Sequence, residues 1–330
     1  MPTHYLYGTI LTSEAVAANN RGDNMGNTST LQKVFHQDDV HTTVSAEAIR
    51  FALRYRFQLE NEKKVNRSYD PESGKLNFAD EKRTYLASEN PEMFIDDDIM
   101  GFMDAAAAKK EREEEDEDEN DQPEATAKPA KGAKKQKAKG TTTKRPSPLA
   151  IGRAVSLRPY RGEISFNAVS GEKVKGKLSL YNAEMHTTEY QYSFGLNLKD
   201  VKNKENISHV IAAIIDPPPV AGNHARFAYD FSPASIVLRV TNAHSSKIQN
   251  CFEHDESNRT YTVNSLIYKV ENGDIPAEEL IIGGAIANTP EGKRLEELKV
   301  KVVKGVISAA QEARNRIAKL GDDFKALSNS

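Results

Sequence analysis

The sequence predicts an α+β fold, and three observations indicate it. A run of β-branched and aromatic residues at positions 4–12, HYLYGTILT, is typical of a central strand. An apolar stripe with helical spacing follows at residues 45–57. After a long charged segment come two strand-like runs, a short helix at 204–215 and a strand at 235–241. This order of strand, helix, strand, strand, helix, strand predicts a ferredoxin-like or RRM-like sheet.

The first helix has a clear start and one apolar face. The hydroxyl of Ser45 can accept a hydrogen bond from an unpaired N–H of the first turn, as an N-cap does. Glu47 lies in that turn, where its charge suits the positive end of the helix dipole. We expect the buried stripe to consist of Ile49, Leu53 and Phe57.

Two arginines on this helix are candidate phosphate ligands. Arg50 and Arg54 lie four residues apart and therefore leave the helix side by side. No carboxylate stands four residues from Arg50 in either direction, or four residues after Arg54. Guanidinium groups match phosphate oxygens, but a solvated basic face explains the pair equally well. Both interpretations stay open at this point.

The segment before the helix, residues 13–40, is expected to be one long loop. Loops of this length in a compact domain are usually functional or disordered. Asn20 and Arg21 supply polar donors, with glycines nearby that allow close approach to a ligand. Asp23 could serve as the carboxylate of a metal-assisted nuclease. A turn residue is the favoured interpretation, because Asp and Asn stabilise such turns.

The middle of the chain is charged and of low complexity. Residues 61–108 are irregular, with a turn at 70–75, and the triple aspartate 96–98 matches a cation site only weakly. Residues 111–121 carry a net charge of −8, and residues 128–145 carry +8. Such composition cannot offset the entropy of ordering, so we expect 109–148 to be a disordered linker. A solvated spacer is favoured over a tether that binds nucleic acid.

A basic hairpin is expected after this linker. Between residues 153 and 177 the chain has six basic residues and two acidic ones. Tyr160 and Phe166 are interleaved with them and could stack on bases. Arg158, Arg161 and Lys173 are the candidate ligands that this count provides.

The last third of the chain carries fewer signals. Residues 244–289 are expected to be irregular, with a strand at 261–270. From Pro290 onwards an apolar stripe predicts one long C-terminal helix over 290–330.

Composition excludes several classes of protein. Among 330 residues Cys251 is the only cysteine, which excludes disulfide frameworks and cysteine-based zinc sites and fits a cytoplasmic protein. No signal peptide and no membrane-spanning stretch is expected. Outside residues 109–145 the net charge is −4, so any nucleic-acid site must be a local groove. Motifs of P-loop, dinucleotide-binding, zinc-protease and serine-hydrolase sites are absent.

Several segments together resemble one known family. YLYGTILT, AANNRGDN and VSAEAIRFALRYRF are similar to the backbone subunit of CRISPR Cascade complexes. The resemblance is to the DevR-type branch of the Cas-seven group in type I systems, with subtype I-B as the expected one. RAVSLRPYRGEISFNA, YQYSFGLNL and IPAEELIIGGAIA extend it over both ordered parts. The charged linker is where this chain departs from it.

The resemblance implies a domain plan. Residues 1–60 and 149–243 would form an RRM-like palm that carries the basic hairpin. Residues 61–108 would be a finger-type insertion, and a thumb is also expected. The remaining parts are the disordered acidic and basic linker 109–148, the irregular region 244–289 and the C-terminal helix 290–330.

The resemblance also implies a function without catalysis, metal or cofactor. Copies of such a subunit polymerise along the spacer of a guide RNA (crRNA), hold its phosphates and present its bases to target DNA. Other Cascade subunits (a repeat-end cap, a large and a small subunit) are expected partners, and no membrane is. The RNA-binding residues that we predict are Asn20, Arg21, Lys33, Ser45, Arg50, Arg54, Arg158, Arg161 and Lys173.

Two alternatives remain at this point. The first is an RNA endonuclease like the type III backbone subunits, with Asp23 as the carboxylate. The resemblance to DNA-targeting type I systems argues against it. The second is a general single-strand binder, which the low net charge of the body disfavours.

Overall fold

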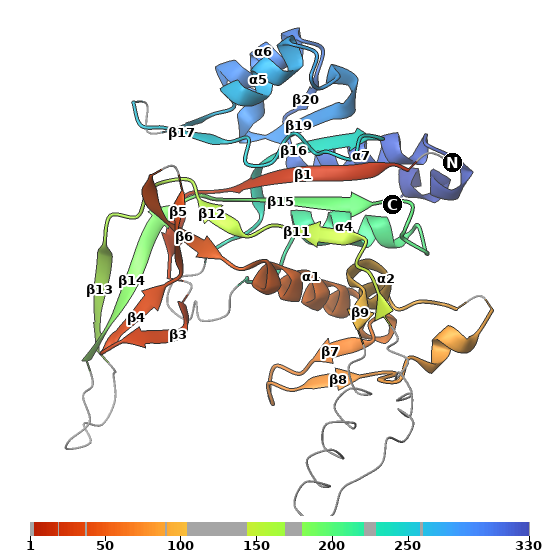
Figure 1. Cartoon of the computed structure of the whole chain (residues 1–330), viewed down its shortest axis with the longest axis horizontal. Helices are drawn as coiled ribbons and strands as arrows, with labels where there is room; N and C mark the ends of the chain where they lie inside the picture. The colour runs from red at the N-terminus through yellow and green to blue at the C-terminus, as the bar shows by residue number, and fades with distance from the viewer. Residues whose placement is uncertain are drawn as a thin grey trace, which may run out of the picture.

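The centre of the molecule is a large mixed sheet (Figure 1). The computed structural model describes residues 3–18, 20–36, 38–89, 91–103, 144–168, 180–220, 229–257 and 260–329, with the backbone alone at 20–23, 167–168, 180–181 and 329. Within these residues the order of hydrogen-bonded strands is β20-β19-β16-β1-β15-β12-β6-β5, and β11 also pairs with β15. Their bounds are β1 Tyr5–Thr12, β5 Lys33–His36, β6 Asp39–Val44, β11 Leu149–Ile151, β12 Ala154–Ser156, β15 Tyr190–Asn197, β16 Pro233–Thr241, β19 Leu280–Gly284 and β20 Lys301–Val303.

The predicted alternation of strands and helices is present in this sheet. Along the chain, β1 is followed by α1 (Ala46–Glu60), β11 and β12, then β15, α4 (Asn206–Ile215) and β16. In space β1 lies between β15 and β16 and is antiparallel to both. The strands predicted at 4–12 and 235–241 and the helix at 204–215 are therefore confirmed to within two residues.

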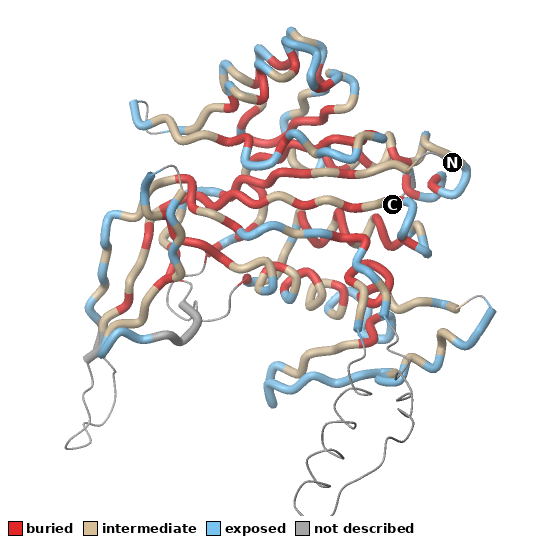
Figure 2. Tube along the Cα trace, viewed as in Figure 1, coloured by how far each residue is buried: buried red, intermediate tan, exposed pale blue. Residues whose placement is uncertain are grey.

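Two hydrophobic cores lie on the two faces of the sheet, because side chains alternate along a strand. Leu6 and Ile10 of β1 belong to the core that contains α1, α4 and α7 (Val306–Ala318). Leu11 belongs to the second core, under α5 (Asn264–Glu271) and α6 (Pro290–Glu297). In Figure 2 the buried residues follow these central strands and the inner sides of the helices.

A second sheet projects from one end of the central sheet, and we call it the arm. It consists of β2 (Ala15–Ala17), β3 (Asn20–Met25), β4 (Thr28–Leu31), β13 (Glu163–Ala168) and β14 (Leu180–Thr188). Its strand order is β13-β14-β4-β3, with β2 beside β14 (Figure 1). β14 and β4 are parallel although about 150 residues separate Asn182 from its partner Thr28. The arm thus joins the segment before α1 to the predicted basic hairpin.

A hairpin of β7 (Arg67–Tyr69) and β8 (Leu76–Phe78) projects on the other side of α1 (Figure 1). Its turn is the one predicted at 70–75, closed by a hydrogen bond from the N–H of Gly74 to the carbonyl of Asp70. Beside it lie the 3-10 turns η1 (Glu62–Lys64) and η2 (Thr84–Ala87), helix α2 (Ile95–Met100), and the pair β9 (Phe102–Met103) and β10 (Lys144–Arg145).

The triple aspartate in α2 anchors this side of the molecule. All three carboxylates are at most 3% exposed, and they point to different partners. Asp96 accepts hydrogen bonds from the backbone N–H groups of Asn66 and Arg67. Asp97 accepts from the side-chain amide of Asn66 and the hydroxyl of Tyr85. Asp98 accepts from the side chains of Arg145 and Asn206 and from the backbone N–H groups of Lys202 and Asn203. Because their oxygens are already occupied, they do not form the cation site considered from the sequence. In the described part of the chain no group of three possible metal ligands occurs.

The long loop predicted at 13–40 is wrong. Those residues instead form β2, β3, β4, β5 and the start of β6. The polar side chains of this segment show no pattern that predicts a strand. The strands form because each one pairs with a neighbouring strand, and a local pattern does not reveal that pairing. The hairpin of β5 and β6, for example, places Lys33 opposite Thr42.

The single C-terminal helix is also wrong. α6 ends at Glu297, β20 pairs in parallel with β19, and α7 begins after Gly305. The sequence KVKVV at 299–303 alternates like a strand, and Lys299 has a positive φ of 71° that breaks the helix. The strand predicted at 261–270 is present only as β18 (Thr260–Thr262), and α5 takes the rest. Of the linker 109–148, residues 109–143 lie outside the described residues, and β10 shows order from Lys144.

Candidate nucleic-acid interface

Helix α1 begins where the sequence predicts. The Oγ of Ser45 accepts a hydrogen bond from the N–H of Ala48 at 3.2 Å and so caps the helix. Ile49, Leu53 and Phe57 are at most 1% exposed, which confirms the buried stripe. This packing fixes the direction in which the two arginines leave the helix.

Arg50 connects three elements of the fold. Its guanidinium donates to the carbonyl oxygens of Leu149 on β11 and Met100 at the end of α2, each at 2.9 Å. Burial lowers the pKa of Arg50 from its usual value. The charge of Glu47 on the same helix opposes that change.

Arg54 has a carboxylate partner that helix spacing could not reveal. Its Nε lies 3.7 Å from Oδ2 of Asp96, which comes from α2. Burial is the main cause that lowers the pKa of Arg54, and the charge of Asp96 opposes that change. Arg50 and Arg54 are therefore not two free prongs, as the sequence interpretation allowed, but groups that hold α1 to its neighbours.

Two of the predicted cations near the foot of the arm, Arg158 and Lys33, are paired with acids. Arg158 forms two hydrogen bonds with the carboxylate of Glu189, at 2.9 and 3.0 Å, and pairs with Glu14 as well. The hydrogen bond with Glu189 is the main cause that raises the pKa of Arg158. Lys33 pairs with Glu184 and lies 4.8 Å from the ring centre of Tyr160. These two cations are compensated by neighbouring acids.

Two other arginines of this region keep their charge. Arg161 is 73% exposed and lies 3.9 Å from an equally exposed Glu256, which is a weak contact in water. Arg153 is exposed and donates to the Gln32 amide oxygen and the Thr43 hydroxyl, both at 3.2 Å. Neither acceptor carries a charge. Arg153 was counted in the basic cluster but not chosen as a ligand, because no spacing rule distinguishes it from Arg158.

An aromatic group on the outer side of α1 was missed from the sequence. Phe51 and Tyr55 are stacked with ring centres 6.3 Å apart, and Tyr69 of β7 meets both rings edge-on. Phe51 is 39% exposed. The four-residue step between Phe51 and Tyr55 was the available signal. Aromatic rings of this kind are platforms on which unpaired bases stack.

One buried histidine joins the arm to the central sheet, and a second connects two strands within that sheet. Nδ1 of His186 on β14 contacts the Thr42 hydroxyl at 2.8 Å, and Nδ1 of His41 contacts the carbonyl of Ser156 at 2.7 Å. Burial lowers the pKa of His186 to about 4 and also lowers that of His41. Both rings are therefore neutral at pH 7 and add no charge to the interface, and His186 positions the arm.

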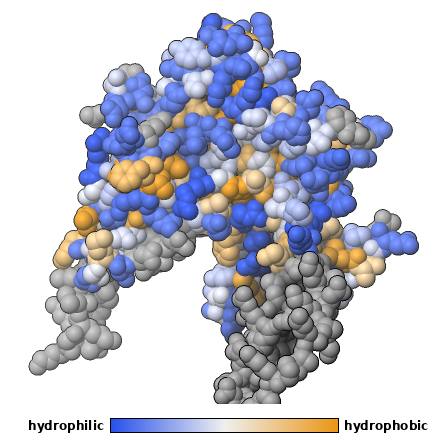
Figure 3. All heavy atoms as spheres, viewed as in Figure 1, coloured by the Kyte–Doolittle hydropathy of each residue, from blue (hydrophilic) through white to orange (hydrophobic). Residues whose placement is uncertain are grey.

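The surface between the two projections is hollowed. In the view of Figure 3, the outline of the molecule has a notch between the arm and the side that carries β7 and β8. Helix α1 lies between these two projections in Figure 1. Ser45 caps this helix, Arg50, Phe51 and Tyr55 lie on it, and Arg153 contacts Thr43 just before it. The helix that carries Arg50 and Arg54 thus lies between the two projections.

Four predicted residues can be placed only in part. Asn20, Arg21 and Asp23 lie on β3, which pairs with β4, but their side chains are outside the description. Lys173 lies outside the described residues altogether. None of the helices in the described part is long and apolar enough to cross a bilayer.

Comparison with known proteins identifies the family. Residues 9–267, more than half of the chain, match the family described as CRISPR-associated negative auto-regulator DevR/Csa2. The chain belongs to the DevR/Csa2 family. A curated relative, the CRISPR-associated protein Cas7/Cst2/DevR of Myxococcus xanthus (strain DK1622), is 35% identical over 324 residues, which cover 95% of this chain and 97% of the relative. The resemblance predicted from the sequence is confirmed.

Solved structures share the fold at much lower identity. A chain of a CRISPR RNA-guided surveillance complex in a pre-nicking state has a TM-score of 0.52 and 12% identity, and covers 94% of this chain and 100% of that one. A chain of another CRISPR RNA-guided surveillance complex has a TM-score of 0.51 and 11% identity over 94% and 99%. Membership of the DevR/Csa2 family gives no support to the endonuclease alternative with Asp23.

Proposed function

We propose that this DevR/Csa2 chain is a non-catalytic backbone subunit of a Cascade surveillance complex of type I, with subtype I-B as the expected one. The observation that carries the proposal is the family match, together with the relative named Cas7/Cst2/DevR that covers nearly the whole chain. The chains of similar fold come from CRISPR RNA-guided surveillance complexes, which supports the same conclusion.

The strand order supports an RRM-like palm. The four strands β16, β1, β15 and β12 follow the order that a βαββαβ chain adopts in a ferredoxin-like sheet. In our proposal the side with β7 and β8 is the finger-type insertion, and the arm is the thumb. The hollow between them would then hold the guide RNA.

Only a few phosphates need to be held by each copy. Phosphate contacts fix the register of a nucleic acid without reading its sequence, so one subunit can serve any spacer. We assign these contacts to Arg153 and Arg161, which keep their charge, and to Asn20, Arg21 and Lys173, which stay predictions.

The other predicted cations have a supporting part in this proposal. Arg50, Arg54 and Arg158 hold the surfaces on which the ligands stand, because their guanidinium groups are bound to carbonyls or carboxylates of the chain. Lys33 positions Tyr160 and shares its charge with Glu184. Ser45 fixes the start of α1. Target DNA is then recognised by pairing with the guide.

Two unlike apolar surfaces support assembly of copies from head to tail. On β13 of the arm, Ile164 and Phe166 share one face and are 57% and 70% exposed. On β8 at the other side of the molecule, Leu76 and Phe78 share one face and are each 41% exposed. Contact between two different surfaces produces open filaments rather than closed dimers. The repeat-end cap, the large subunit and the small subunit would bind at the ends and along the sides of this filament.

The assembly can be tested at the arm. Replacing Ile164 and Phe166 together by serine should reduce the number of copies on one guide RNA, measured by mass photometry. Tyr268→Ser, on α5 and 62% exposed, is the matched control and should leave that number unchanged. Equal filament lengths in both variants would exclude β13 from the contact.

The function itself is tested by the RNA that the protein carries. The chain is purified with its co-expressed locus, and the bound RNA is sequenced. RNAs of uniform length with a repeat-derived end and varied spacers are expected. Random cellular RNA would indicate a general single-strand binder, and an absence of RNA would contradict the proposed function.

A further inference from the structure

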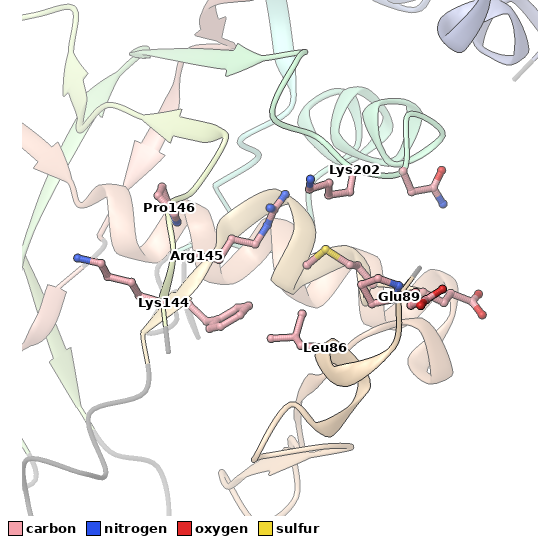
Figure 4. A pocket seen from close by; sticks show the side chains of 11 residues that line it. Leu86, Glu89, Lys144, Arg145, Pro146 and Lys202 are labelled. Atoms are coloured by element: carbon pink, nitrogen blue, oxygen red, sulfur yellow. The ribbon is translucent and has the colours of Figure 1, made fainter. Parts of the chain in front are cut away.

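A cavity of about 660 Å³ lies on the finger side of the molecule, away from Arg153 and Arg161. Its wall is formed by η2 and the chain after it, by the pair β9 and β10, and by Lys202 and Asn203 before α4 (Figure 4). Its volume falls in the range of ~300–1,000 Å³ that small-molecule sites occupy. No contact described so far uses the interior of this cavity.

The middle of the cavity is apolar. Leu86, Met93 and Phe102 line it and are only partly exposed. The ring of Phe102 is held in place by Arg83, whose guanidinium carbon lies 4.1 Å from the ring centre. A flat apolar or aromatic group would bury surface here, and the aromatic ring adds a stacking partner for it.

The ends of the cavity carry opposite charges. Figure 4 shows Lys144 at one end, Glu89 at the other, and Lys202 above them. Glu92 also lines the cavity. All four side chains are exposed, and within the described residues none of them has an ion pair or a side-chain hydrogen bond. By contrast, Arg145 is already bound to Asp98 at 2.6 Å.

A ligand for this cavity must therefore combine three properties. It needs a negative group for Lys144 and Lys202, a flat body for the apolar middle, and hydrogen-bond donors for Glu89 and Glu92. An acidic peptide has single backbone N–H groups but no flat body with two donors side by side on one edge, and an isolated phosphate lacks the body. A nucleotide has all three properties, with its phosphate, its base and the polar edge of that base.

We propose that the cavity binds one guanine nucleotide unit. An ionised carboxylate only accepts hydrogen bonds, so it prefers two neighbouring donors. Guanine offers such a pair, N1–H and the N2 amino group. Adenine, cytosine and uracil each have an acceptor beside the donor on this edge, which would repel a carboxylate. Lysines hold the phosphate as point charges and do not distinguish bases.

This inference rests on the cavity and not on the proposed guide-binding function. The same chemistry has two sources, a free guanine nucleotide or a guanine within a single strand of nucleic acid. A strand that passes the finger side would place one base in the cavity and its phosphate at Lys144. The two sources are distinguished by the probes of the experiment.

The experiment titrates the full chain, freed of bound RNA, with the 5′-monophosphates of guanosine, adenosine, cytidine and uridine. Binding of the guanosine nucleotide is expected to be about tenfold tighter than that of the other three, a difference of about 1.4 kcal/mol. Glu89→Gln with Glu92→Gln should abolish this preference and keep the weaker common affinity. Lys144→Ala with Lys202→Ala should weaken all four nucleotides by about tenfold, as loss of charged phosphate contacts does.

The matched control replaces Lys63 and Lys64 of η1 by alanine. Both are exposed and stand outside the cavity, so their removal should change no affinity. An oligouridylate with one guanine tests the second source: tighter binding than the free nucleotide, lost with Glu89→Gln and Glu92→Gln, assigns the site to a strand. Binding of the free nucleotide alone assigns it to a small ligand.

Equal affinity for the four nucleotides in the unaltered protein would overturn the proposal, as would equal losses in the control and the Lys144 and Lys202 variant. Either result would leave the guide-RNA test of the proposed function untouched, because that test reads the RNA bound along the hollow. Circular dichroism of each variant confirms that it folds before its affinity is compared.

Discussion

The cations around the foot of the arm fall into two groups that differ in their partners and not in their residue type. Arg158 is bound to Glu189 and Glu14, whereas Arg153, five residues earlier, is bound to an amide oxygen and a hydroxyl. The charge of the first arginine is compensated by these carboxylates, and the charge of the second is not compensated by its two partners. A phosphate would meet repulsion from two carboxylates at Arg158 and none from the partners of Arg153.

This difference teaches how a basic cluster should be interpreted. Counting lysines and arginines along a segment gives the sum of the charges, but a ligand interacts with the charges that remain after pairing. The body of this protein has a net charge of −4 outside 109–145, so its charge as a whole does not attract a polyanion. The few unpaired cations determine where a polyanion binds.

The largest effect should come from breaking the paired group. Arg158→Ala leaves Glu189, which is 8% exposed, without its main partner, and should lower the free energy of unfolding by about 3 kcal/mol. Thermal and urea denaturation measure this loss. Glu189→Gln in the same chain should restore part of it, because the unpaired charge is removed. A stable Arg158→Ala protein that no longer binds RNA would reverse our assignment.

Arg50 is an intermediate case, since it keeps its charge but its hydrogen bonds are used within the fold. Arg50→Ala should lower the free energy of unfolding by about 2 kcal/mol, because two carbonyl groups lose a charged donor. RNA affinity per folded molecule should change little. Arg56→Ala on the same helix is the control and should cost less than about 1 kcal/mol, since its ion pairs are exposed. Loss of RNA binding without loss of stability would restore Arg50 as a phosphate ligand.

The next effect is a dependence of the free energy of unfolding on pH, caused by His186, which lies near the ion pair of Arg158 and Glu189. His186 has its pKa lowered by burial to about 4, against about 6.5 in the unfolded chain. Between these values the unfolded state binds more protons, so stability is full above about pH 6.5 and falls as the pH drops towards 4. The loss should reach about 3 kcal/mol at pH 4. Urea denaturation at several pH values should show it, and a flat profile in the unaltered protein would contradict the burial of His186.

How much of this could be known from the sequence depends on the range of each interaction. The helix at Ser45, the stripe of Ile49, Leu53 and Phe57 and the strands β1 and β16 follow from local patterns and were predicted. The alternation of strands and helices along the chain was also predicted. These features need no knowledge of distant partners.

The rest depends on partners far apart in the chain. Asp96 neutralises Arg54 from 42 positions away, and Glu184 pairs with Lys33 from still further. The strands of the arm form because the segment before α1 meets β14, which no local pattern in a polar segment reveals. The prediction of one C-terminal helix was wrong because the apolar stripe used for it runs through β20, a strand that pairs with β19.

The most direct test of the account compares salt dependence of guide-RNA binding in Arg153→Gln, Arg161→Gln and Arg158→Ala, with two guides of different spacer. Each lost phosphate contact on a single strand lowers the slope of log affinity against log salt by about 0.7. We predict this change for Arg153→Gln and for Arg161→Gln, alike for both spacers, and an unchanged slope for folded Arg158→Ala. A lower slope in Arg158→Ala alone would contradict the rule that unpaired cations hold the guide.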